Sequence, residues 1–469
     1  MMRVEEAARV LGARALGSDV EFLAVTTDTR SIKAGDLFVA LKGERFDGHT
    51  FVAQAAAAGA AAAMVAASPA PTLPARFPLI VVDDTLDALG RLAAHWRQRF
   101  DIPVVALTGS SGKTTVKEML AAILRKAVPV EPAGADDTVL ATQGNLNNHI
   151  GVPLTLLRLR GTHRYAVVEM GMNHAGEIAY ISRLAQPDVA LINNAGVAHI
   201  ENLGSEEAIA RAKGEIFCGL KPGGTAVINA DERHASLWRE MAAGHQQLDF
   251  GIDAAAAVTA TYRLRELDSE IVLRTSDAEI RARVPAPGLH NVRNALAASA
   301  AALALDVSAG AITAGLARFT GVKGRLAFRP ALRGATLIDD TYNANPDSAR
   351  AAISVLAQAA GTRLLVLGDM GELGAHGPAL HAQIGEFART AGVHRLFTLG
   401  TLSEQATRAF GAGARHFTRI EHLLAEIEPA LVPGVTLLIK GSRFMKMERV
   451  VAAFVADTSD AAATNGGHA

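Results

Sequence analysis

One stretch of the sequence restricts the fold more than any other, because an apolar run ends there in a turn of small residues. Residues 102–107 read IPVVAL, residues 108–115 read TGSSGKTT, and residues 116–127 read VKEMLAAILRKA, an amphipathic helix pattern. Glycine and serine allow backbone N–H groups to crowd around an anion at the start of a helix, where the helix dipole also favours negative charge. We therefore expect a phosphate-binding loop between a buried strand and a helix.

The two residues that close this turn carry the chemistry. Lys113 supplies a positive charge for the β- and γ-phosphates, and the hydroxyl of Thr114 suits Mg²⁺. The common phosphate-loop pattern has a further glycine where this chain has Leu107, so the loop is one glycine short. A turn that contains GKT by chance would not account for the strand and the helix on either side. A nucleoside triphosphate site is predicted from the loop residues Thr108, Gly109, Ser110, Ser111, Gly112, Lys113, Thr114 and Thr115.

The chain of 469 residues is long enough for about three domains, each with its own core. Short apolar strands alternate with helix patterns, which predicts mostly parallel sheets, whereas residues 258–284 show the alternation typical of antiparallel hairpins. The expected fold class is α/β in three domains. They are a small N-terminal α/β module at 1–84, a central phosphate-loop domain with a parallel sheet at 85–320, and a C-terminal Rossmann-like domain at 321–457, followed by a flexible tail at 458–469.

Three local features lead to narrower predictions. The alanine-rich run FVAQAAAAGAAAAMVAA at 51–67 is predicted to be one helix, too short and too weakly apolar to cross a membrane. Gly324, in the sequence GVKGR, is a candidate hinge between the second and third domains. Cys218, the single cysteine, is predicted to be a small buried apolar residue.

Composition excludes several classes of function. A formal net charge of -1 provides no basic face for nucleic acid. One cysteine permits neither an internal disulfide nor a cysteine-based zinc site, which is typical of a reducing compartment. The N-terminus MMRVEEAARVLG lacks the apolar core of a signal peptide, and no run of about 20 apolar residues occurs. We expect a soluble cytoplasmic monomer without nucleic-acid partners or an integral membrane segment.

Polar residues also occur where other predicted elements end or begin. Glu169 follows an apolar strand, where phosphate-loop enzymes use a carboxylate for Mg²⁺; a surface glutamate after an edge strand is the alternative. His199 lies beyond the next strand and fits a ligand or a structural role equally. Lys213, on a helical segment, would by itself be a solvated lysine. Asn291 and Asn294 share one face of a helix start, where amides read a purine or cap the helix.

Seven motifs follow one another along the chain in the order TGSSGKTT, VVEMG, AHIENLGS, AKGEIF, PGLHNVRNALAA, GVKGR and DDTYNANP. In this order they resemble the Mur ligase superfamily across nearly the whole chain. The superfamily also includes folylpolyglutamate synthetase, and its members share an ATPase domain whose loop has the shortened TGxxGKT form. The resemblance therefore accounts for the glycine that is missing at Leu107.

Several stretches narrow this resemblance. The segment TTDTRSIKAGDLFVALKGERFDGHTFV is similar to the UDP-binding module of the ligases that add the third residue and the terminal dipeptide. The segments TQGNLNNHIGVPLTLLRL, DDTYNANPDS and VLGDMGELG are similar to members that join D-alanyl-D-alanine to UDP-N-acetylmuramoyl (UDP-MurNAc) tripeptide. The Asp-Asn-Pro-Arg motif, which third-residue ligases use to hold a diamino acid, does not occur in the C-terminal part of the sequence.

The resemblance implies an ATP-dependent amide-bond ligase of peptidoglycan synthesis. ATP would convert the tripeptide carboxylate into an acyl phosphate, because oxide is a poor leaving group, and the dipeptide amine would then displace phosphate. The implied ligands are ATP, Mg²⁺, UDP-MurNAc-tripeptide and D-alanyl-D-alanine. The implied catalytic residues are Lys113, Glu169, His199, Lys213 and Arg325.

The same resemblance implies binding roles. Thr114 and Glu169 would hold a first Mg²⁺, and His199 would hold a second one together with Lys213 in the form of a carbamate. Beyond the loop, ATP would meet Asn291 and Asn294 at the adenine, Arg325 at the γ-phosphate and Asp340 at the ribose. The tripeptide nucleotide would meet Thr29, Arg30, Ser31, Asn145, Asn147 and Asn148. Lys440, Ser442 and Arg443 in KGSRFMKMERV would meet the dipeptide or a phosphate, or would simply form a basic surface helix.

Other functions fit less well. A third-residue ligase would add a free amino acid instead of a dipeptide. A nucleotide-gated binding protein would use the loop as a switch, but would have no need of Glu169, His199 and Lys213 as ligands. A dehydrogenase is not supported, because the glycine cluster at Gly411 lacks the third glycine of the dinucleotide fingerprint.

Overall fold

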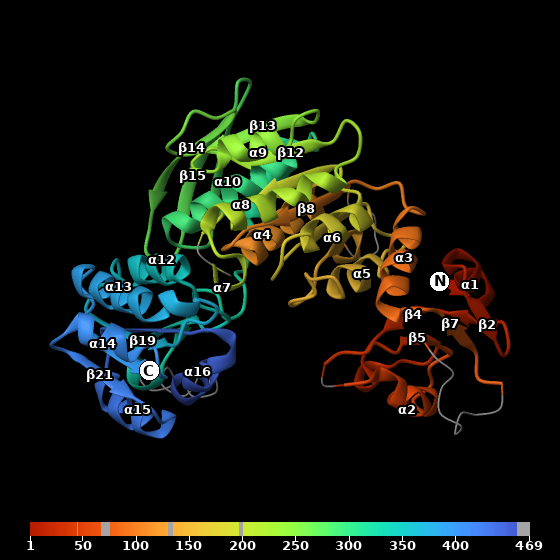
Figure 1. The fold of residues 1–469 in the computed structure, drawn as a ribbon. Helices are drawn as coiled ribbons and strands as arrows, with labels where there is room; N and C mark the ends of the chain where they lie inside the picture. The colour runs from red at the N-terminus through yellow and green to blue at the C-terminus, as the bar shows by residue number, and fades with distance from the viewer. Residues whose placement is uncertain (45, 67–75, 130–134, 197–199, 457–469) are drawn as a thin grey trace, which may run out of the picture.

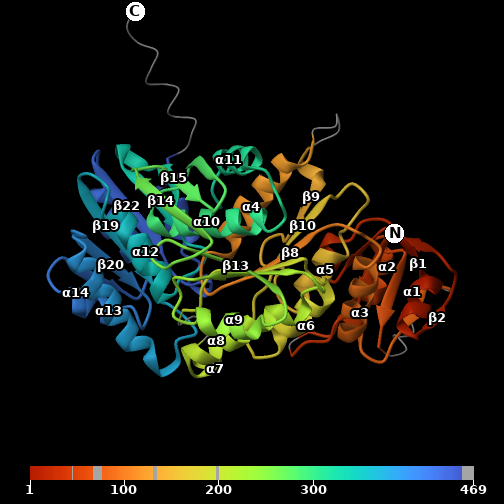
Figure 2. The same cartoon turned by 90° about the horizontal axis from the view of Figure 1, so that it is seen from above.

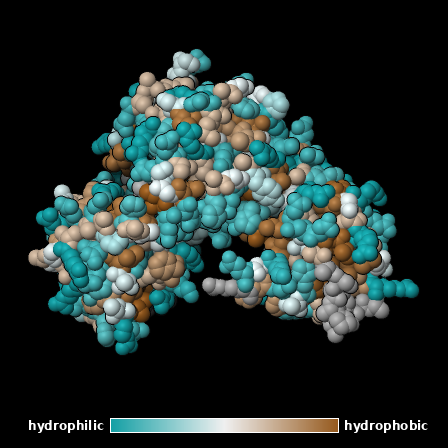
Figure 3. All heavy atoms as spheres, viewed as in Figure 1, coloured by the Kyte–Doolittle hydropathy of each residue, from teal (hydrophilic) through white to brown (hydrophobic). Residues whose placement is uncertain are grey.

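The computed structural model describes residues 1–44, 46–66, 76–129, 135–196 and 200–456. They form three lobes, each built on its own main sheet, and the N-terminal and C-terminal lobes lie on either side beneath the central one (Figure 1). Figure 3 shows an open space between these two lower lobes. The three main sheets fall within the three predicted domains, whose boundaries stay predictions, and the predicted tail lies outside the described residues.

The N-terminal lobe contains a five-stranded sheet in the order β2-β7-β6-β5-β4. Only β2 is antiparallel to its neighbour, so the module is the small α/β unit expected. A two-stranded antiparallel sheet of β1 and β3 completes the lobe. The elements are β1 (Met2–Arg3), α1 (Val4–Leu11), β2 (Arg14–Leu16), β3 (Glu21–Phe22), β4 (Ala24–Thr26), β5 (Asp36–Val39), α2 (Val52–Ala57), β6 (Ala62–Val65) and β7 (Leu79–Val81).

The alanine-rich run does not form the single helix that was predicted. Helix α2 ends at Ala57, and the alanines from Ala62 onward belong to strand β6. Gly59, between the two, has φ +100°, a conformation that glycine adopts without strain and that ends the helix. Because β6 is fully buried between β5 and β7, sheet pairing outweighs the high helix propensity of alanine.

Helix α3 (Thr85–Arg97) connects the N-terminal lobe to the central lobe. The Asp84 carboxylate accepts hydrogen bonds from the backbone N–H groups of Leu86 and Asp87 at 2.7 and 3.0 Å, which fixes the start of the helix. At the other end, the Trp96 indole donates to the carbonyl of Leu159 at 3.1 Å. The apolar side of α3 belongs to a core cluster that includes residues of both lobes, so the two lobes share buried surface.

The central lobe contains a nine-stranded sheet in the order β16-β15-β14-β13-β12-β11-β8-β10-β9. In the order of the sheet, the neighbouring strands from β14 to β9, with β8 among them, run parallel to one another. Strands β14, β15 and β16 form the predicted antiparallel hairpins. The strands are β8 (Val104–Thr108), β9 (Val139–Ala141), β10 (Tyr165–Glu169), β11 (Val189–Ile192), β12 (Thr225–Asn229), β13 (Gln246–Gly251), β14 (Val258–Leu264), β15 (Ser269–Arg274) and β16 (Glu279–Val284).

Helices cover both faces of this sheet, as Figure 2 shows. Strand β8 is buried throughout, and alternate side chains enter two different core clusters: Val104 and Ala106 in one, Val105 and Leu107 in the other. The second cluster contains α4, α10 and α11, and the first contains α5, α6 and α8. The helices are α4 (Lys113–Ala127), α5 (Gly151–Leu156), α6 (Glu177–Ala185), α7 (Ile200–Leu203), α8 (Glu206–Gly214), α9 (Ala235–Met241), α10 (Leu289–Leu303) and α11 (Ala309–Ala317).

The C-terminal lobe contains a six-stranded sheet in the order β17-β18-β22-β19-β20-β21, parallel except at β17. Gly324, the predicted hinge, lies shortly before strand β17 and has φ +72°. The strands are β17 (Ala327–Pro330), β18 (Thr336–Asp340), β19 (Thr362–Gly368), β20 (Arg395–Leu399), β21 (Ala414–Phe417) and β22 (Val435–Lys440). The helices are α12 (Pro346–Leu356), α13 (Gly377–Thr390), α14 (Glu404–Phe410), α15 (Ile420–Ile427) and α16 (Glu448–Phe454).

Two surface properties complete the fold. Cys218 is exposed, which contradicts the prediction of a buried apolar residue. It follows the buried Phe217 in the short turn after α8, where neighbouring side chains point in different directions. Within the part of the chain that the structure describes, no helix combines the length and the apolar character needed to cross a bilayer.

Candidate active site

A cavity of about 890 Å³ lies where the central and C-terminal lobes meet. Its walls come from the carboxyl ends of β8, β10 and β11 in one lobe and of β18 and β22 in the other. Strand β8 lies between β10 and β11, the point at which the strand order reverses and where ligands of parallel sheets bind. The predicted site residues that line it are Ser110, Ser111, Gly112, Lys113, Thr115, Asn145, Asn147, Asn148, Glu169, Asn291, Asn294, Arg325, Asp340 and Lys440.

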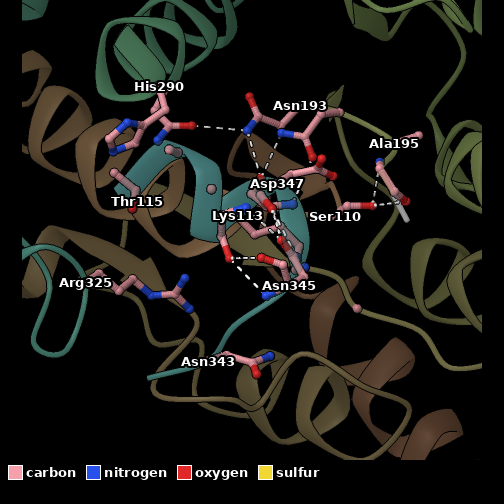
Figure 4. A pocket seen from close by; sticks show the side chains of 18 of the residues that line it. Ser110, Lys113, Thr115, Asn193, Ala195, His290, Arg325, Asn343, Asn345 and Asp347 are labelled. Carbon is pink, nitrogen blue, oxygen red and sulfur yellow. Dashed lines mark hydrogen bonds between the residues drawn. The ribbon is translucent and has the colours of Figure 1, made fainter. Parts of the chain in front are cut away.

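The loop after β8 is held open by asparagines of other segments (Figure 4). The backbone N–H of Ser111 donates to Asn194 Oδ1 at 2.8 Å, and Asn193 Nδ2 donates to the Ser111 carbonyl at 3.0 Å. Gly112 has φ +78°, and a Cβ atom there would collide with the amide of Asn294. The loop therefore requires glycine at this point, and hydrogen bonds to the neighbouring asparagines hold its shape.

Lys113 is the first residue of α4 and turns back over the loop. Its Nζ donates to the carbonyl of Gly109 at 2.6 Å. Burial lowers the pKa of Lys113, and the nearby positive charge of Arg325 lowers it further, whereas Glu169 and Glu372 raise it. The amine is thus placed over the region where the loop N–H groups would hold phosphates.

Thr114 is the meeting point of three segments. Its hydroxyl donates to Glu169 Oε2 at 2.9 Å, and Asn147 Nδ2 donates to Glu169 Oε1 at 2.8 Å. Glu169 is only 2% exposed. Arg325 Nη2, from the C-terminal lobe, donates to the same Thr114 hydroxyl at 2.9 Å. The structure therefore brings together Thr114, Glu169, Asn147 and Arg325, which were predicted from separate motifs.

The donors around Thr114 fit a magnesium ion. Mg²⁺ is usually held by one or two carboxylates together with water and substrate phosphates, and the Thr114 hydroxyl and the Glu169 carboxylate are oxygen donors of this kind. In the described ranges, no group of three or more His, Cys, Asp or Glu side chains gathers to hold a metal. His199, the predicted ligand of a second ion, lies outside the described residues.

Lys213 is not the solvated lysine that its helix alone would indicate. It lies on α8 and is 2% exposed. Burial lowers the pKa of its amine well below the ordinary value, and the charge of Lys113 lowers it further. A buried lysine close to a second lysine favours the neutral amine.

The C-terminal lobe holds Arg325 through a contact of its own and makes one further contact with the loop. The guanidinium of Arg325 lies over the ring of Tyr342, with 4.4 Å between the carbon and the ring centroid. The Asn345 amide donates to Ser111 Oγ at 3.2 Å. The ring of Tyr342 therefore supports the guanidinium of Arg325, and Figure 4 shows Arg325 and Asn345 in the same pocket.

The residues predicted for the nucleoside lie on facing walls. Asn291 Nδ2 donates to the Pro287 carbonyl at 2.8 Å, so this amide secures the start of α10, while Asn294 accepts from Asn193 at 3.2 Å. Opposite them, Asp340 accepts from the amine of Lys440, whose positive charge only partly offsets the rise in the Asp340 pKa caused by burial.

Five predicted substrate residues do not line this cavity. Thr29, Arg30 and Ser31 form a short turn in the N-terminal lobe, where the 86% exposed side chain of Arg30 pairs with Asp28 at 2.7 Å. Arg443 is 65% exposed and pairs with Glu448. Ser442 is buried and does not line the cavity; its hydroxyl donates to the Ala344 carbonyl at 3.0 Å.

Several residues of the cavity had not been assigned from the sequence. Asn193 and Asn194 follow β11 and shape the loop, while Tyr342 and Asn345 position the C-terminal lobe against it. The signal was present, because the asparagines directly follow an apolar strand and the other two lie inside the motif DDTYNANP.

Comparison with known proteins identifies the family. Residues 21–97 match the family model described as Mur ligase family, catalytic domain, residues 107–302 match the Mur ligase middle domain, and residues 324–443 match the Mur ligase, glutamate ligase domain. The chain belongs to the Mur ligase family. The predicted resemblance is therefore confirmed.

Curated relatives of this Mur ligase share one name. The chain is 44% identical to UDP-N-acetylmuramoyl-tripeptide--D-alanyl-D-alanine ligase of Escherichia coli, over 95% of this chain and 96% of the relative. It is 40% identical to the ligase of that name from Haemophilus influenzae, with coverage of 95% and 96%. The similarity extends over all three lobes.

Solved structures agree with this similarity. MurF from Acinetobacter baumannii is 38% identical, with a TM-score of 0.88 over 96% of this chain and 98% of that chain. MurF ligase from Thermotoga maritima, solved in complex with ADP, is 27% identical, with a TM-score of 0.79 over 92% and 96%. The predicted three-domain α/β fold is confirmed.

Proposed function

We propose that this Mur ligase uses ATP to join D-alanyl-D-alanine to UDP-MurNAc-tripeptide, and thereby makes the pentapeptide precursor of peptidoglycan. The observation that carries the proposal is its whole-length similarity, at 44% identity, to the Escherichia coli ligase of that name. The complex of the Thermotoga maritima relative with ADP supports nucleotide binding at the loop after β8. The cytoplasmic location and the monomeric state stay predictions.

The first chemical step transfers the γ-phosphoryl group of ATP to the tripeptide carboxylate. Both partners are anions, so the site must neutralise charge before they can meet at about 3 Å. Lys113 and the loop N–H groups face the β- and γ-phosphates, and Arg325 supplies a third positive group from the C-terminal lobe. The supporting geometry is the 2.9 Å hydrogen bond from Arg325 to Thr114, which brings the guanidinium to the loop.

Thr114 and Glu169 would hold a first Mg²⁺, and Lys213 with His199 a second. Bound Mg²⁺ offsets the negative charge of the phosphates during the transfer. In this proposal, Lys213 reacts with CO₂ through its neutral amine, which forms an N–C bond, loses a proton and becomes an anionic carbamate with two oxygens. The deep burial of Lys213 and the lowered pKa of its amine support this assignment.

In the second step, the dipeptide amine first loses the proton of its ammonium form and then attacks the acyl carbon, so that the C–N bond forms, the bond to phosphate breaks and the nitrogen releases a second proton. Asn291 and Asn294 would contact the adenine and Asp340 the ribose. A second cavity of about 450 Å³ is lined by Asn291, Arg325 and apolar side chains such as Pro287 and Phe319, and is the space proposed for the base. Asn145, Asn147 and Asn148 would contact the tripeptide nucleotide.

The remaining predicted residues would bind the outer ends of the two substrates. Thr29, Arg30 and Ser31 would bind the UDP part from the N-terminal lobe. Lys440, Ser442 and Arg443 would serve the dipeptide end. Because Lys440 pairs with Asp340 and Ser442 with backbone, these two would act by positioning the loops around them.

The proposal is tested by ADP release with ATP, Mg²⁺, UDP-MurNAc-tripeptide and D-alanyl-D-alanine, each omitted in turn. Release should require all four, and the nucleotide product should gain the mass of the dipeptide less one water. Full activity with a free diamino acid in place of the dipeptide would instead indicate a third-residue ligase. Nucleotide binding without substrate-dependent ADP release would indicate a binding protein.

A further inference from the structure

Lys117 is a buried, charged side chain that the reaction described above does not use. It lies on α4, four residues and about one helical turn after Lys113, and it does not line the main cavity. Lys117 is only 1% exposed. Burying an ammonium group costs free energy that an apolar side chain of similar length would avoid, and lysine is almost never fully buried unless it is paired. The contacts of this group therefore bear directly on its role.

The Lys117 ammonium group contacts the end of strand β9, the last strand on this side of the sheet. Its Nζ atom donates to the carbonyl of Thr142 at 2.5 Å, and Thr142 directly follows β9. The carboxylate of the neighbouring Glu118 lies 2.8 Å from the same Nζ atom and offsets part of its charge. Hydrogen bonds from a charged donor are stronger than those between neutral groups. Helix α4 is thus tied to the point at which β9 ends.

Thr142 in turn holds the backbone of Glu169. The N–H of Thr142 donates to the carbonyl of Val167 at 3.1 Å, which continues the pairing of β9 with β10. Beyond this point the side chain of Thr142 takes over, because its hydroxyl oxygen accepts from the N–H of Glu169 at 2.9 Å. Lys117, Thr142 and Glu169 are each 2% exposed or less. These buried contacts form a continuous path from α4 to Glu169.

The position of the Glu169 carboxylate depends on this path. One of its oxygens accepts from Thr114 at 2.9 Å and the other from Asn147 at 2.8 Å, so a shift of the backbone would weaken both contacts. Helix α4 meets Glu169 twice, directly through Thr114 and from behind through Lys117 and Thr142. Magnesium demands near-ideal octahedral geometry, which makes the placement of a carboxylate ligand critical.

We propose that Lys117 is a positioning residue that sets the Glu169 carboxylate, through Thr142, for the magnesium site. This inference rests on the ligase function and the Mg²⁺ site proposed above, and it adds a layer of residues behind Thr114 and Glu169. Lys117 touches neither ATP nor the two substrates in this account. It acts as a fixed charge that locks the helix of the phosphate loop to the end of β9.

The test compares Lys117→Met, which keeps the length of the side chain and removes the donor, with the wild type. Calorimetry measures the affinity for a non-hydrolysable ATP analogue at saturating Mg²⁺ and in EDTA. We expect binding with Mg²⁺ to weaken roughly 10- to 100-fold, the usual cost of losing a residue behind a metal ligand. Binding in EDTA should change less than about twofold, because Lys113 and the loop are intact. Lys126→Met, at the exposed end of α4, is the matched control and should equal the wild type in both conditions.

The second link of the path is tested at Thr142. Thr142→Val keeps the shape and removes the hydroxyl, so it should show the same Mg²⁺-dependent loss, whereas Thr142→Ser should recover most of it. Because the two links act in series, the double variant of Lys117→Met and Thr142→Val should lose little more than either single variant. This pair of substitutions also tests the inference if Lys117→Met alone does not fold.

The outcomes separate a positioning role from a structural one. An equal loss of affinity with and without Mg²⁺, or unchanged affinity in both conditions, would overturn the inference. A crystal structure of Lys117→Met in which Glu169 keeps both its contacts, to Thr114 and to Asn147, would also overturn it. A wild-type enzyme that binds the analogue more tightly with Mg²⁺ but shows no dipeptide-dependent ADP release would instead contradict the proposed function.

Discussion

The two lower lobes differ in how they relate to the phosphate loop. The C-terminal lobe already contacts it, through Arg325 on Thr114 and Asn345 on Ser111. The N-terminal lobe shares buried surface with the central lobe through α3, yet its predicted nucleotide residues Thr29, Arg30 and Ser31 do not line the cavity. The part of the site proposed for ATP is therefore assembled from two lobes, whereas the lobe proposed to hold UDP is separated from the C-terminal lobe by an open space (Figure 3).

This difference indicates that the lobes contribute in different ways to the proposed reaction. Transfer of a phosphoryl group requires precise placement of charges, because a misplacement of about 1 Å can cost on the order of 10²-fold in rate, and short hydrogen bonds between buried or half-buried groups provide that placement. Binding the far end of a long nucleotide requires a lobe that extends to it, and rigid placement of that lobe matters less. Substitutions in the two regions should consequently have effects of different size and kind.

The largest effect is expected at Lys213, on the assembled side. Lys213→Ala should be nearly inactive, because the substitution would remove the proposed carbamate and with it the support for the proposed second Mg²⁺. Acetate or formate, which fills the vacated space with a carboxylate, should restore part of the rate in an ADP-release assay. An alanine variant that is active without rescue would contradict the carbamate, as would density that ends at a bare amine while both metals are bound.

Lys113→Ala should reduce turnover on the order of 10³-fold or more, because it removes a charge placed against the transferring phosphate. The variant should fold normally, as judged by circular dichroism. Lys126→Ala, at the exposed opposite end of the same helix, provides the matched control. Turnover within a few fold of the wild type would mean that the loop is not the catalytic phosphate site.

Arg325→Ala tests the contact between the lobes and should reduce kcat about 10²-fold, because one group that stabilises the transferring charge is removed. Arg408→Ala, in an exposed pair on the C-terminal lobe, should leave kcat unchanged. If Arg325→Ala matched this control, the hydrogen bond to Thr114 would be a structural contact without a part in catalysis.

Arg30→Ala, in the N-terminal lobe, should have the smallest effect and a different one. We expect a rise of roughly 10-fold in the KM for UDP-MurNAc-tripeptide with the KM for ATP unchanged, because an exposed cation binds the nucleotide end without touching the chemistry. Arg9→Ala on α1 is the control in the same lobe. An equal rise in the KM for ATP would contradict the distinction between the two regions.

The sequence was most informative where local pattern and chemistry coincide. The loop from Thr108 to Thr115 and the strand ending in Glu169 lie where their apolar runs predicted. Pairings across the chain were not accessible: Thr114 and Arg325 are 211 residues apart, and nothing local indicates that their side chains meet. The alanine-rich run shows the converse, because tertiary pairing turned a segment of high helix propensity into strand β6.

The central claim is that substrate binding brings the N-terminal lobe toward an ATP site formed by the central and C-terminal lobes. Small-angle scattering tests this claim. The radius of gyration should fall when a non-hydrolysable ATP analogue and UDP-MurNAc-tripeptide are bound together, because the lobes close around both ligands, and should fall less with either alone. An unchanged radius of gyration, with binding of both ligands confirmed by calorimetry, would contradict the claim.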